Sequence, residues 1–187
     1  MTRRSFLRFS ALVAVYLVAA VPFKAMNLIP GFTDIRPVEA LGPVYGIFFG
    51  LPGCFASGFG NLAADALAAE LRWTSIAGFA SHFVGSLLAW LFWTRLSRTP
   101  FSLRTPGDLL RYVLVAVAIA VVEDAIITPA VVLLYPDVDW TFFAGAVFCN
   151  TAGFPIFLGI PLSILLQEEM GLQPADPRLQ DPPPEPR

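Results

Sequence analysis

The stretch IAGFASHFVGSLLAWLFW, residues 76–93, is an apolar run of about the length needed to cross a bilayer, and His82 is its only side chain that can carry a positive charge. Two further apolar runs, ALVAVYLVAAVPF at 11–23 and YVLVAVAIAVV at 112–122, flank it along the chain. Buried helices of soluble proteins are shorter and amphipathic, so this pattern excludes a soluble domain. The sequence therefore predicts an all-α, polytopic membrane protein.

The composition leads to the same conclusion. The 187 residues are 56% hydrophobic and only 14% charged, with a mean hydropathy of +0.68. No water-soluble core of this size could bury so much apolar surface, so lipid must be the solvent. The net charge is −2, and no basic stripe carries aromatic residues that could stack on bases, which excludes nucleic-acid binding. Cys54 and Cys149 are isolated and are interpreted as packing residues.

Four segments are long enough to span the membrane, at a helical rise of about 1.5 Å per residue across a core of about 30 Å. The third of them is expected to tilt, or to break at Thr128-Pro129. The stretch 39–71 is ambiguous, because it fits either one long helix or a hairpin that turns at Gly50-Leu51-Pro52-Gly53. The four segments are 6–23, 74–94, 109–135 and 140–166.

The arginines decide between the two alternatives, because cytoplasmic loops are rich in Arg and Lys. One arginine group lies at the start of the first helix and a second follows the 74–94 helix, so an even number of crossings must separate them. The hairpin satisfies this condition, although its first arm, 39–51, is short and is expected to reach only part of the way or to lie buried among neighbours. The two groups are Arg3, Arg4 and Arg8, and Arg95, Arg98, Arg104 and Arg111.

The resulting prediction is about six transmembrane helices with both termini in the cytoplasm, in the inner (plasma) membrane of the cell. Residues 1–172 form the transmembrane domain. Residues 173–187 are rich in proline and polar residues, and we expect a disordered cytoplasmic tail there.

Small residues recur at four-residue spacing along the hairpin, for example at Gly46/Gly50, Gly53/Ser57 and Gly60/Ala64. Such spacing lets helix backbones approach closely, so the hairpin is predicted to pack on several sides. Ser10 and Ala14 form one similar step on the first helix. This step fits either internal packing or docking to another membrane subunit.

Several polar residues fall inside the predicted spans, where ionisable groups are costly and by default mark a polar cavity or a pathway. Counted from the helix ends, they share a layer in the outer half of the bundle. The asparagines could instead tie helices together by hydrogen bonds, and His82 could be a packing residue. The adjacent acids Glu123 and Asp124 point about 100° apart, so at least one should face a cavity or a partner. The candidate substrate-binding residues are Asn61, Asp65, His82, Glu123, Asp124 and Asn150.

An enzyme is the weakest interpretation of these residues. His82 with Glu123 and Asp124 could in principle ligate a metal, but their spacing does not match a zinc site. The sequence contains no H-E-x-x-H, G-x-S-x-G or Walker A motif. We therefore expect no enzymatic activity, no cofactor and no bound metal, and any use of ATP must come from another chain.

Three stretches carry a resemblance to a known family. They are MNLIPGFTDIRP at 26–37, GIFFGLPG at 46–53 and GFGNLAAD at 58–65. Together they resemble the substrate-binding S components of energy-coupling-factor transporters. The resemblance implies a receptor that binds a vitamin or similar micronutrient from outside, beneath a mobile loop at 24–38. It also implies a transmembrane coupling protein and two cytoplasmic ATPases as partners, with small residues of the first helix, here Ser10 and Ala14, as the docking face.

The sequence thus favours a substrate-binding subunit for micronutrient uptake. The main alternative is a structural or scaffolding membrane protein whose polar residues only hold helices together, and an intramembrane enzyme comes third. Acids near the pocket would suit a cationic or amine-bearing solute, although Arg36 could reverse that preference. No residue pattern identifies the solute.

Overall fold

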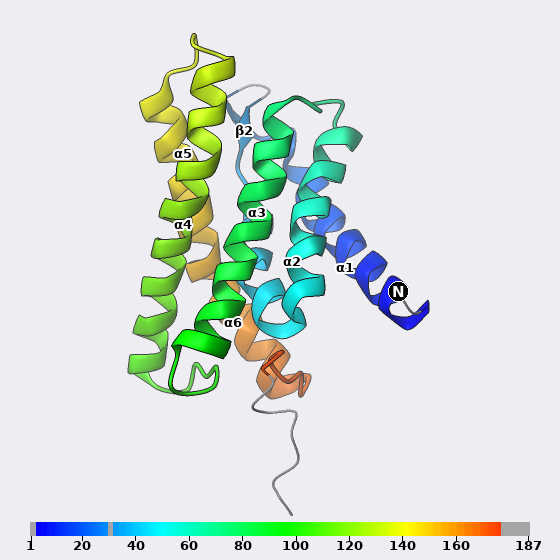
Figure 1. Cartoon of the computed structure of the whole chain (residues 1–187), viewed down its shortest axis with the longest axis vertical. Helices are drawn as coiled ribbons and strands as arrows, with labels where there is room; N and C mark the ends of the chain where they lie inside the picture. The colour runs from blue at the N-terminus through cyan, green and yellow to red at the C-terminus, as the bar shows by residue number, and fades with distance from the viewer. Residues whose placement is uncertain (1–2, 30–31, 177–187) are drawn as a thin grey trace, which may run out of the picture.

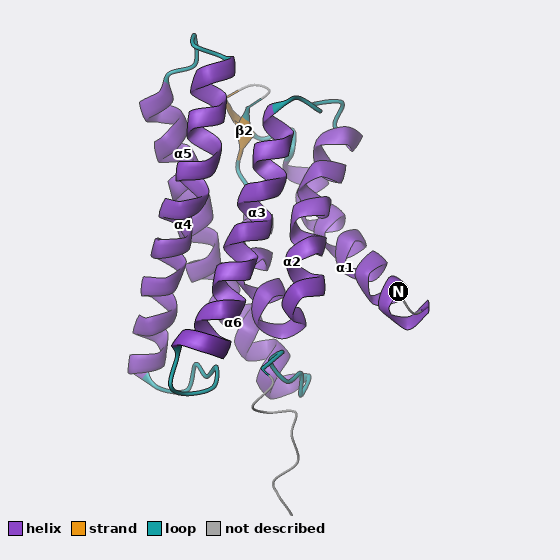
Figure 2. Cartoon of the chain, viewed as in Figure 1, coloured by secondary structure: helices purple, strands orange, loops and turns teal. Residues whose placement is uncertain are grey.

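The computed structural model describes residues 3–29 and 32–176, and Figures 1 and 2 show them as a bundle of long helices. Pro30 and Gly31 of the predicted loop, and residues 177–187 of the predicted tail, lie outside the described residues. The helices are α1 (Arg3–Ala20), α2 (Leu41–Leu67), α3 (Thr74–Leu91), α4 (Pro106–Leu134), α5 (Trp140–Phe154) and α6 (Ile160–Ile164). Shorter helical turns are Val21–Phe23, Pro37–Ala40, Phe92–Leu96, Pro155–Gly159 and Leu165–Glu169, and the strands are β1 (Asn27–Ile29) and β2 (Thr33–Asp34).

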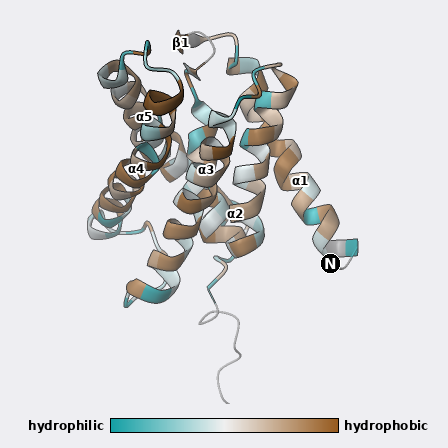
Figure 3. Cartoon of the chain, turned by 45° about the horizontal axis from the view of Figure 1, so that its top comes forward, coloured by the Kyte–Doolittle hydropathy of each residue, from teal (hydrophilic) through white to brown (hydrophobic). Residues whose placement is uncertain are grey.

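Within the described ranges, 5 helical stretches are long and apolar enough to cross a membrane. The most apolar windows of the first and fourth stretches are only 11% and 22% buried inside the protein, so most of their apolar side chains face outward, as lipid contact requires. Figure 3 shows this pattern, with hydrophobic residues along the helices and hydrophilic ones concentrated in loops and at the N-terminal end of α1. The prediction of a helical membrane protein is confirmed. The stretches are Ser5–Phe23, Pro37–Leu67, Thr74–Leu96, Pro106–Leu134 and Trp140–Glu169.

Helix α2 is a hairpin that reverses at Gly50. This glycine has φ 59° and ψ −142°, a non-helical backbone conformation that residues with a side chain rarely adopt. Contacts with α3 reveal the direction of each arm. The first arm runs parallel to α3, because residue numbers rise together along both: Glu39 lies near His82, Gly46 near Ser86 and Gly50 near Trp90. The second arm runs antiparallel to α3, with Phe55 near Phe83, Gly58 near Phe79 and Asn61 near Gly78.

The first arm of the hairpin is enclosed by the rest of the bundle. Every residue from 38 to 48 is buried, so this short arm does not need to match the thickness of the bilayer with a lipid-facing surface. Its glycines permit the enclosure, since a methyl group added at Gly46 would overlap the backbone carbonyl of Ser86 on α3. On the second arm, a methyl group at Gly60 would overlap the Tyr16 ring of α1. Both arms of α2 are therefore closely packed on either side of the kink at Gly50.

Replacing Gly50 by alanine should destabilise the protein by about 2 kcal/mol, because the turn holds this residue at a backbone conformation that strains any side chain. Thermal unfolding of the purified variant in detergent measures the effect. Gly153→Ala on α5 is the control, since a methyl group there would meet no atom within 4 Å. Equal melting temperatures for the two variants would mean that Gly50 does not need its unusual conformation.

The two ends of the bundle differ in character. Figure 1 shows the β1–β2 hairpin, the α2–α3 loop and the α4–α5 loop at one end, and the α3–α4 loop and the α2 turn at the other. The α3–α4 loop contributes Phe101 and Leu103 to an apolar core that also contains Ile47, Trp93 and Tyr112. Polar side chains collect instead beneath the β hairpin. This division positions the candidate site.

Two details refine the sequence predictions. Helix α4 continues through Pro129 without a break. The tail does not begin at 173, because the backbone N–H of Ala175 donates to the carbonyl of Ile47 at 2.8 Å, and the indole of Trp90 donates to the carbonyl of Ala175 at 2.9 Å. Asp176 is only 1% exposed. The packed domain therefore extends to the end of the described residues, because the hairpin turn offers backbone groups that this segment can pair.

Candidate functional site

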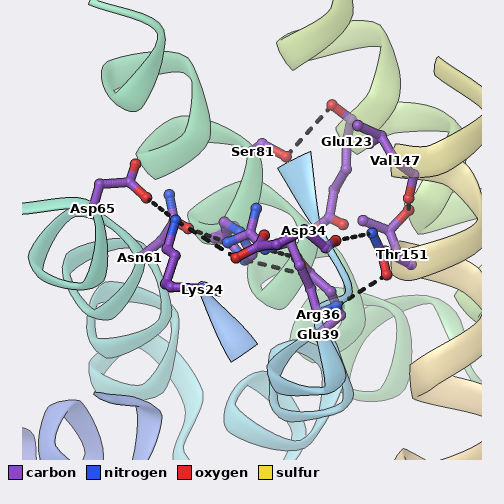
Figure 4. Close-up of polar contacts among 12 residues, drawn as sticks. Lys24, Asp34, Arg36, Glu39, Asn61, Asp65, Ser81, Glu123, Val147 and Thr151 are labelled. Atoms are coloured by element: carbon purple, nitrogen blue, oxygen red, sulfur yellow. Dashed lines mark hydrogen bonds and ion pairs between the residues drawn. The ribbon is translucent and has the colours of Figure 1, made fainter. Parts of the chain in front are cut away.

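A buried polar cluster lies under the segment 24–38, at the end of the bundle that carries the β hairpin. Its side chains come from this segment, both arms of the α2 hairpin and its following loop, and helices α3, α4 and α5, so residues far apart in sequence meet here. Figure 4 shows several of them converging between the helices. The polar cluster consists of Lys24, Asp34, Arg36, Glu39, Asn61, Asp65, Glu70, His82, Glu123 and Asn150.

Arg36 is the centre of the polar cluster. Its Nε lies 3.2 Å from Oε1 of Glu39 and 3.6 Å from Oδ1 of Asp34, and its Nη2 donates to Oδ1 of Asn61. Burial disfavours the charged guanidinium and lowers its pKa, but neighbouring acids, with Glu39 foremost, outweigh burial and raise the pKa of Arg36 above its ordinary value. Arg36 is therefore a fixed positive charge in the interior.

Lys24 neutralises the acids on the other side of the polar cluster. Its Nζ lies 2.7 Å from Asp65, 3.2 Å from Glu70 and 3.9 Å from Asp34. Burial raises the pKa of Asp34 above its ordinary value, against the opposing effects of Arg36 and Lys24. These ion pairs join the segment 24–38 to the second arm of the hairpin and to the loop after it, and so hold this segment over the polar cluster.

Asn150 fixes the same segment to α5. Its Nδ2 donates to the carbonyl of Asp34 at 2.9 Å, and its Oδ1 accepts from the backbone N–H of Arg36 at 3.1 Å. Both ends of the amide are therefore engaged by the backbone beside the charged residues. This use of an asparagine is the helix-tying role that the sequence left open.

His82 and Glu123 form the deepest part of the polar cluster. His82 Nδ1 lies 3.4 Å from Oε2 of Glu39 and 3.4 Å from the hydroxyl of Tyr16. Glu123 extends from α4 towards Arg36 and Glu39, as Figure 4 shows, and is 4% exposed. Gly85 of α3 makes room for it, since a methyl group there would overlap the carboxylate.

Two small cavities adjoin the polar cluster. One of about 40 Å³ lies near Lys24, Asn61 and Asp65, and another of about 20 Å³ lies beside Glu39, His82 and Ser81. Phe32, Arg36 and Ile127 line both cavities and separate them. A single water needs roughly 10–15 Å³, so the present spaces hold a few water-sized groups rather than a vitamin. In this structure the polar cluster is therefore closed to a solute of that size.

The structure brings together five of the six candidate residues from the sequence, namely Asn61, Asp65, His82, Glu123 and Asn150. Asp124 is the exception, because its carboxylate accepts a hydrogen bond at 2.5 Å from the hydroxyl of Thr128 on its own helix. The adjacent acids thus point in different directions, and only Glu123 enters the interior. Whether these residues bind a solute stays a prediction.

Sequence reasoning left five charged members of the polar cluster out of the candidate site. One is Glu70, in the loop after the hairpin, and the other four, Lys24, Asp34, Arg36 and Glu39, lie in or beside the loop before it. In the structure the segment that carries them folds back into the bundle. A local signal was available, since Arg36 and Glu39 have opposite charges and are three residues apart at the start of an apolar segment. That signal predicts a pair but not its burial.

The proposed docking residues occupy the outer side of α1. Helix α1 packs on the hairpin through Leu12, Tyr16 and Ala20, whereas Ala14 is exposed and Ser10 is half-buried. The Ser10/Ala14 step is therefore not the main contact of α1 with its own bundle. Of the two interpretations given for it, docking to another subunit stays a prediction.

A comparison of the chain with protein-family models, curated proteins and solved structures finds no match.

Proposed function

We propose that this protein is a membrane-embedded substrate-binding subunit for the uptake of a small, vitamin-like micronutrient. The observation that supports this most is the polar cluster, a set of charged side chains inside a bundle whose outer surface suits lipid. Charges at such depth are costly and occur mainly where a solute or ion is handled. The resemblance to the S components of energy-coupling-factor transporters points to the same class.

The proposal includes a topology of six crossings with both termini in the cytoplasm of a plasma membrane. The reversal at Gly50 supports it, because it splits one apolar stretch into two antiparallel arms. Arg95 in the helical turn Phe92–Leu96, and Arg98 and Arg104 in the loop that follows, lie at the end opposite the polar cluster, as expected for a cytoplasmic side. The polar cluster would then face the outer side, from which a nutrient arrives.

Uptake by such a subunit needs energy from other chains. We assign this role to a transmembrane coupling protein and cytoplasmic ATPases, as the resemblance implies. The exposed side of α1 with Ala14 is a surface that a membrane partner could contact.

Entry of a solute requires movement of the segment 24–38, because the cavities are too small in this structure. The contacts that must break are the ion pair of Lys24 with Asp65 and the hydrogen bonds of Arg36 with Asn61 and of Asn150 with the backbone at 34–36. All are polar contacts that water or a bound solute could replace. The segment is therefore suited to open and close over the polar cluster.

Thermal unfolding of the detergent-purified protein against a panel of vitamins, nucleobases and amines tests the function. A solute that binds only the folded state stabilises it by about 2.7 kcal/mol at one hundred times its Kd, so a true ligand should raise the melting temperature in a saturable way. Asn61→Ala should reduce the shift, and Gly145→Ala on α5, where a methyl group meets no atom within 4 Å, should leave it unchanged.

A scaffolding protein is the second candidate, favoured by the number of polar groups that already bond to one another in this structure. In that case the polar cluster would only join helices. A well-folded protein that no compound of a broad panel stabilises would support the scaffold and contradict a receptor.

A further inference from the structure

A groove runs between α3 and α4 on the outside of the bundle, in the half opposite the polar cluster. Its volume is about 430 Å³, against about 40 and 20 Å³ for the two cavities beside the polar cluster. Leu88, Phe92 and Leu96, spaced four residues apart on one face of the chain, form its wall on the α3 side. The α4 wall extends from Arg111 to Val122. The groove is therefore large enough for a molecule of many atoms.

The length of the groove matches one leaflet of a bilayer. Arg111 and Val122 lie about 16 Å apart along the axis of α4, at a helical rise of about 1.5 Å per residue. The hydrocarbon core is about 30 Å thick, so the groove extends from the membrane surface to near the midplane. Leu96 and Leu114 in its walls are 73% and 61% exposed, which leaves the groove open to lipid along its side.

Arg111 is the one charged side chain among the described residues that line the groove. Its Nη1 donates to the hydroxyl of Thr99 at 2.9 Å, and its guanidinium lies 5.9 Å from the centre of the Trp93 ring. Asp108 lies 3.8 Å from Nη1, beyond hydrogen-bond distance, and accepts instead from the hydroxyl of Thr105. A guanidinium has five N–H groups, so Arg111 is held in place and can still donate to an anion.

Further guanidinium groups flank the same end of the groove in the sequence. Arg95 and Arg98 stand on either side of Leu96, and both are exposed. Neither lies within 4.0 Å of a carboxylate in the part of the chain that the structure describes. No acid among these residues lines the groove. A negatively charged group at this end would thus be attracted rather than repelled.

Two other grooves of similar size lack this combination. One of about 390 Å³, between α1 and the hairpin turn beside Phe6 and Phe55, is lined by apolar residues and Ser5, without a charge among the described residues. The other, of about 510 Å³, contains Arg72, but its guanidinium lies over the rings of Phe32 and Tyr135, at 4.7 and 5.7 Å from their centroids. Apolar walls alone select no lipid, because all acyl chains are equally apolar.

We propose that the groove between α3 and α4 binds one anionic phospholipid, with an acyl chain along its apolar walls and the phosphate on Arg111. The phosphate oxygens would accept charge-assisted hydrogen bonds from the guanidinium. In the proposed topology this end faces the cytoplasm, where the leaflet is rich in anionic lipids and basic pockets between helices bind their head groups. The site goes beyond the proposed function and would serve a receptor or a scaffold alike.

Native mass spectrometry of the detergent-purified protein tests the proposal, because it counts bound lipids and gives the affinity of the first one. The probes are dioleoyl-phosphatidylglycerol and dioleoyl-phosphatidylcholine, which share their acyl chains and differ in head-group charge. We expect the phosphatidylglycerol to bind about fivefold more tightly or better, the effect of one basic residue near an anionic lipid surface. Equal affinities for the two lipids would overturn the proposal.

Two arginine variants locate the charge that selects the lipid. Arg111→Gln should bring the ratio of the two affinities close to one. Arg104→Gln is the matched control, since it removes the same charge from the same end of the bundle, but Arg104 is 72% exposed, pairs with Glu168 and does not line the groove. Its ratio should equal that of the wild type. An unchanged ratio in Arg111→Gln, or an equal loss in both variants, would overturn the site.

A third variant tests the place of the acyl chain. Ala118 is exposed in the wall of the groove, and Ala118→Phe should fill the space and weaken both lipids several-fold without changing their ratio. Ala14→Phe on the exposed side of α1 is the control. Equal affinities in the two variants, each shown to be folded by its melting temperature, would overturn the groove. If glycerol 3-phosphate, which has no acyl chains, displaces phosphatidylglycerol at equal concentration, the site binds a free anion and the lipid is wrong.

Discussion

Replacing Gly46 by alanine is expected to lower the stability of the protein by about 3 kcal/mol or more, at the upper end of the range for overpacked interiors. The added methyl group would overlap the backbone carbonyl oxygen and carbon of Ser86, and neither can move without shifting α3. Because residues 38–48 of the first arm are buried, the arm cannot relieve this overlap by moving out towards lipid. The fraction of monodisperse protein after detergent extraction and its melting temperature measure the effect.

Gly145→Ala serves as the control for this prediction as well, since its methyl group would face open space on α5. A more informative comparison is Gly85→Ala on α3, where the obstacle is the movable end of a side chain instead of backbone. We expect a large loss of stability for Gly46→Ala and a small one for Gly85→Ala. Equal losses would mean that the first arm can shift away from α3.

Replacing Arg36 by glutamine is expected to destabilise the protein by about 3–5 kcal/mol at pH 7, the range for breaking one side of a buried ion pair. Glu39 would lose its only cation within 4.0 Å in the described structure apart from His82, and Asp34 would retain only the more distant Lys24. The penalty should shrink as the pH falls, because an unpaired buried carboxyl then takes up a proton. Unfolding measured across a pH series records both effects.

The double variant Arg36→Gln with Glu39→Gln should recover much of the lost stability, since it removes the acid that the single variant leaves unpaired. Arg104→Gln is the surface control. Its side chain is 72% exposed and pairs with Glu168 at 2.9 Å, and such pairs contribute about 0–1 kcal/mol. If Arg36→Gln were as mild as Arg104→Gln, water would have to reach the polar cluster in this structure.

The sequence was sufficient for the helices and for the hairpin, because both follow from local chemistry. Apolar runs of sufficient length must be helical in lipid, and the Gly-Leu-Pro-Gly stretch at 50–53 disfavours a continuous helix. The arginine groups favoured a hairpin over one long helix, and in the structure the backbone leaves the helical conformation at Gly50. The sequence also predicted a shared polar layer, since distance from a helix end converts directly into depth.

The composition of the polar cluster was harder to predict because it depends on a loop. Arg36 and Glu39 enter the interior only because the segment 24–38 folds back and Asn150 holds its backbone, a contact between residues more than a hundred positions apart. Hydropathy assigns such a segment to the outside. The choice between Glu123 and Asp124 likewise depends on helix rotation, which Gly85 decides by leaving room for one of the two acids.

The pairing of Ala175 with Ile47 and Trp90 affects the order in which the chain can fold during synthesis. A membrane protein is inserted from its N-terminus, so the α2 hairpin and α3 leave the ribosome long before residue 175. Until then the carbonyl of Ile47 and the indole N–H of Trp90 lack these partners. The last described residues therefore complete the hydrogen bonds of the hairpin turn only after the rest of the bundle has been made. A nascent chain stalled before them would expose that turn to the quality-control machinery of the cell.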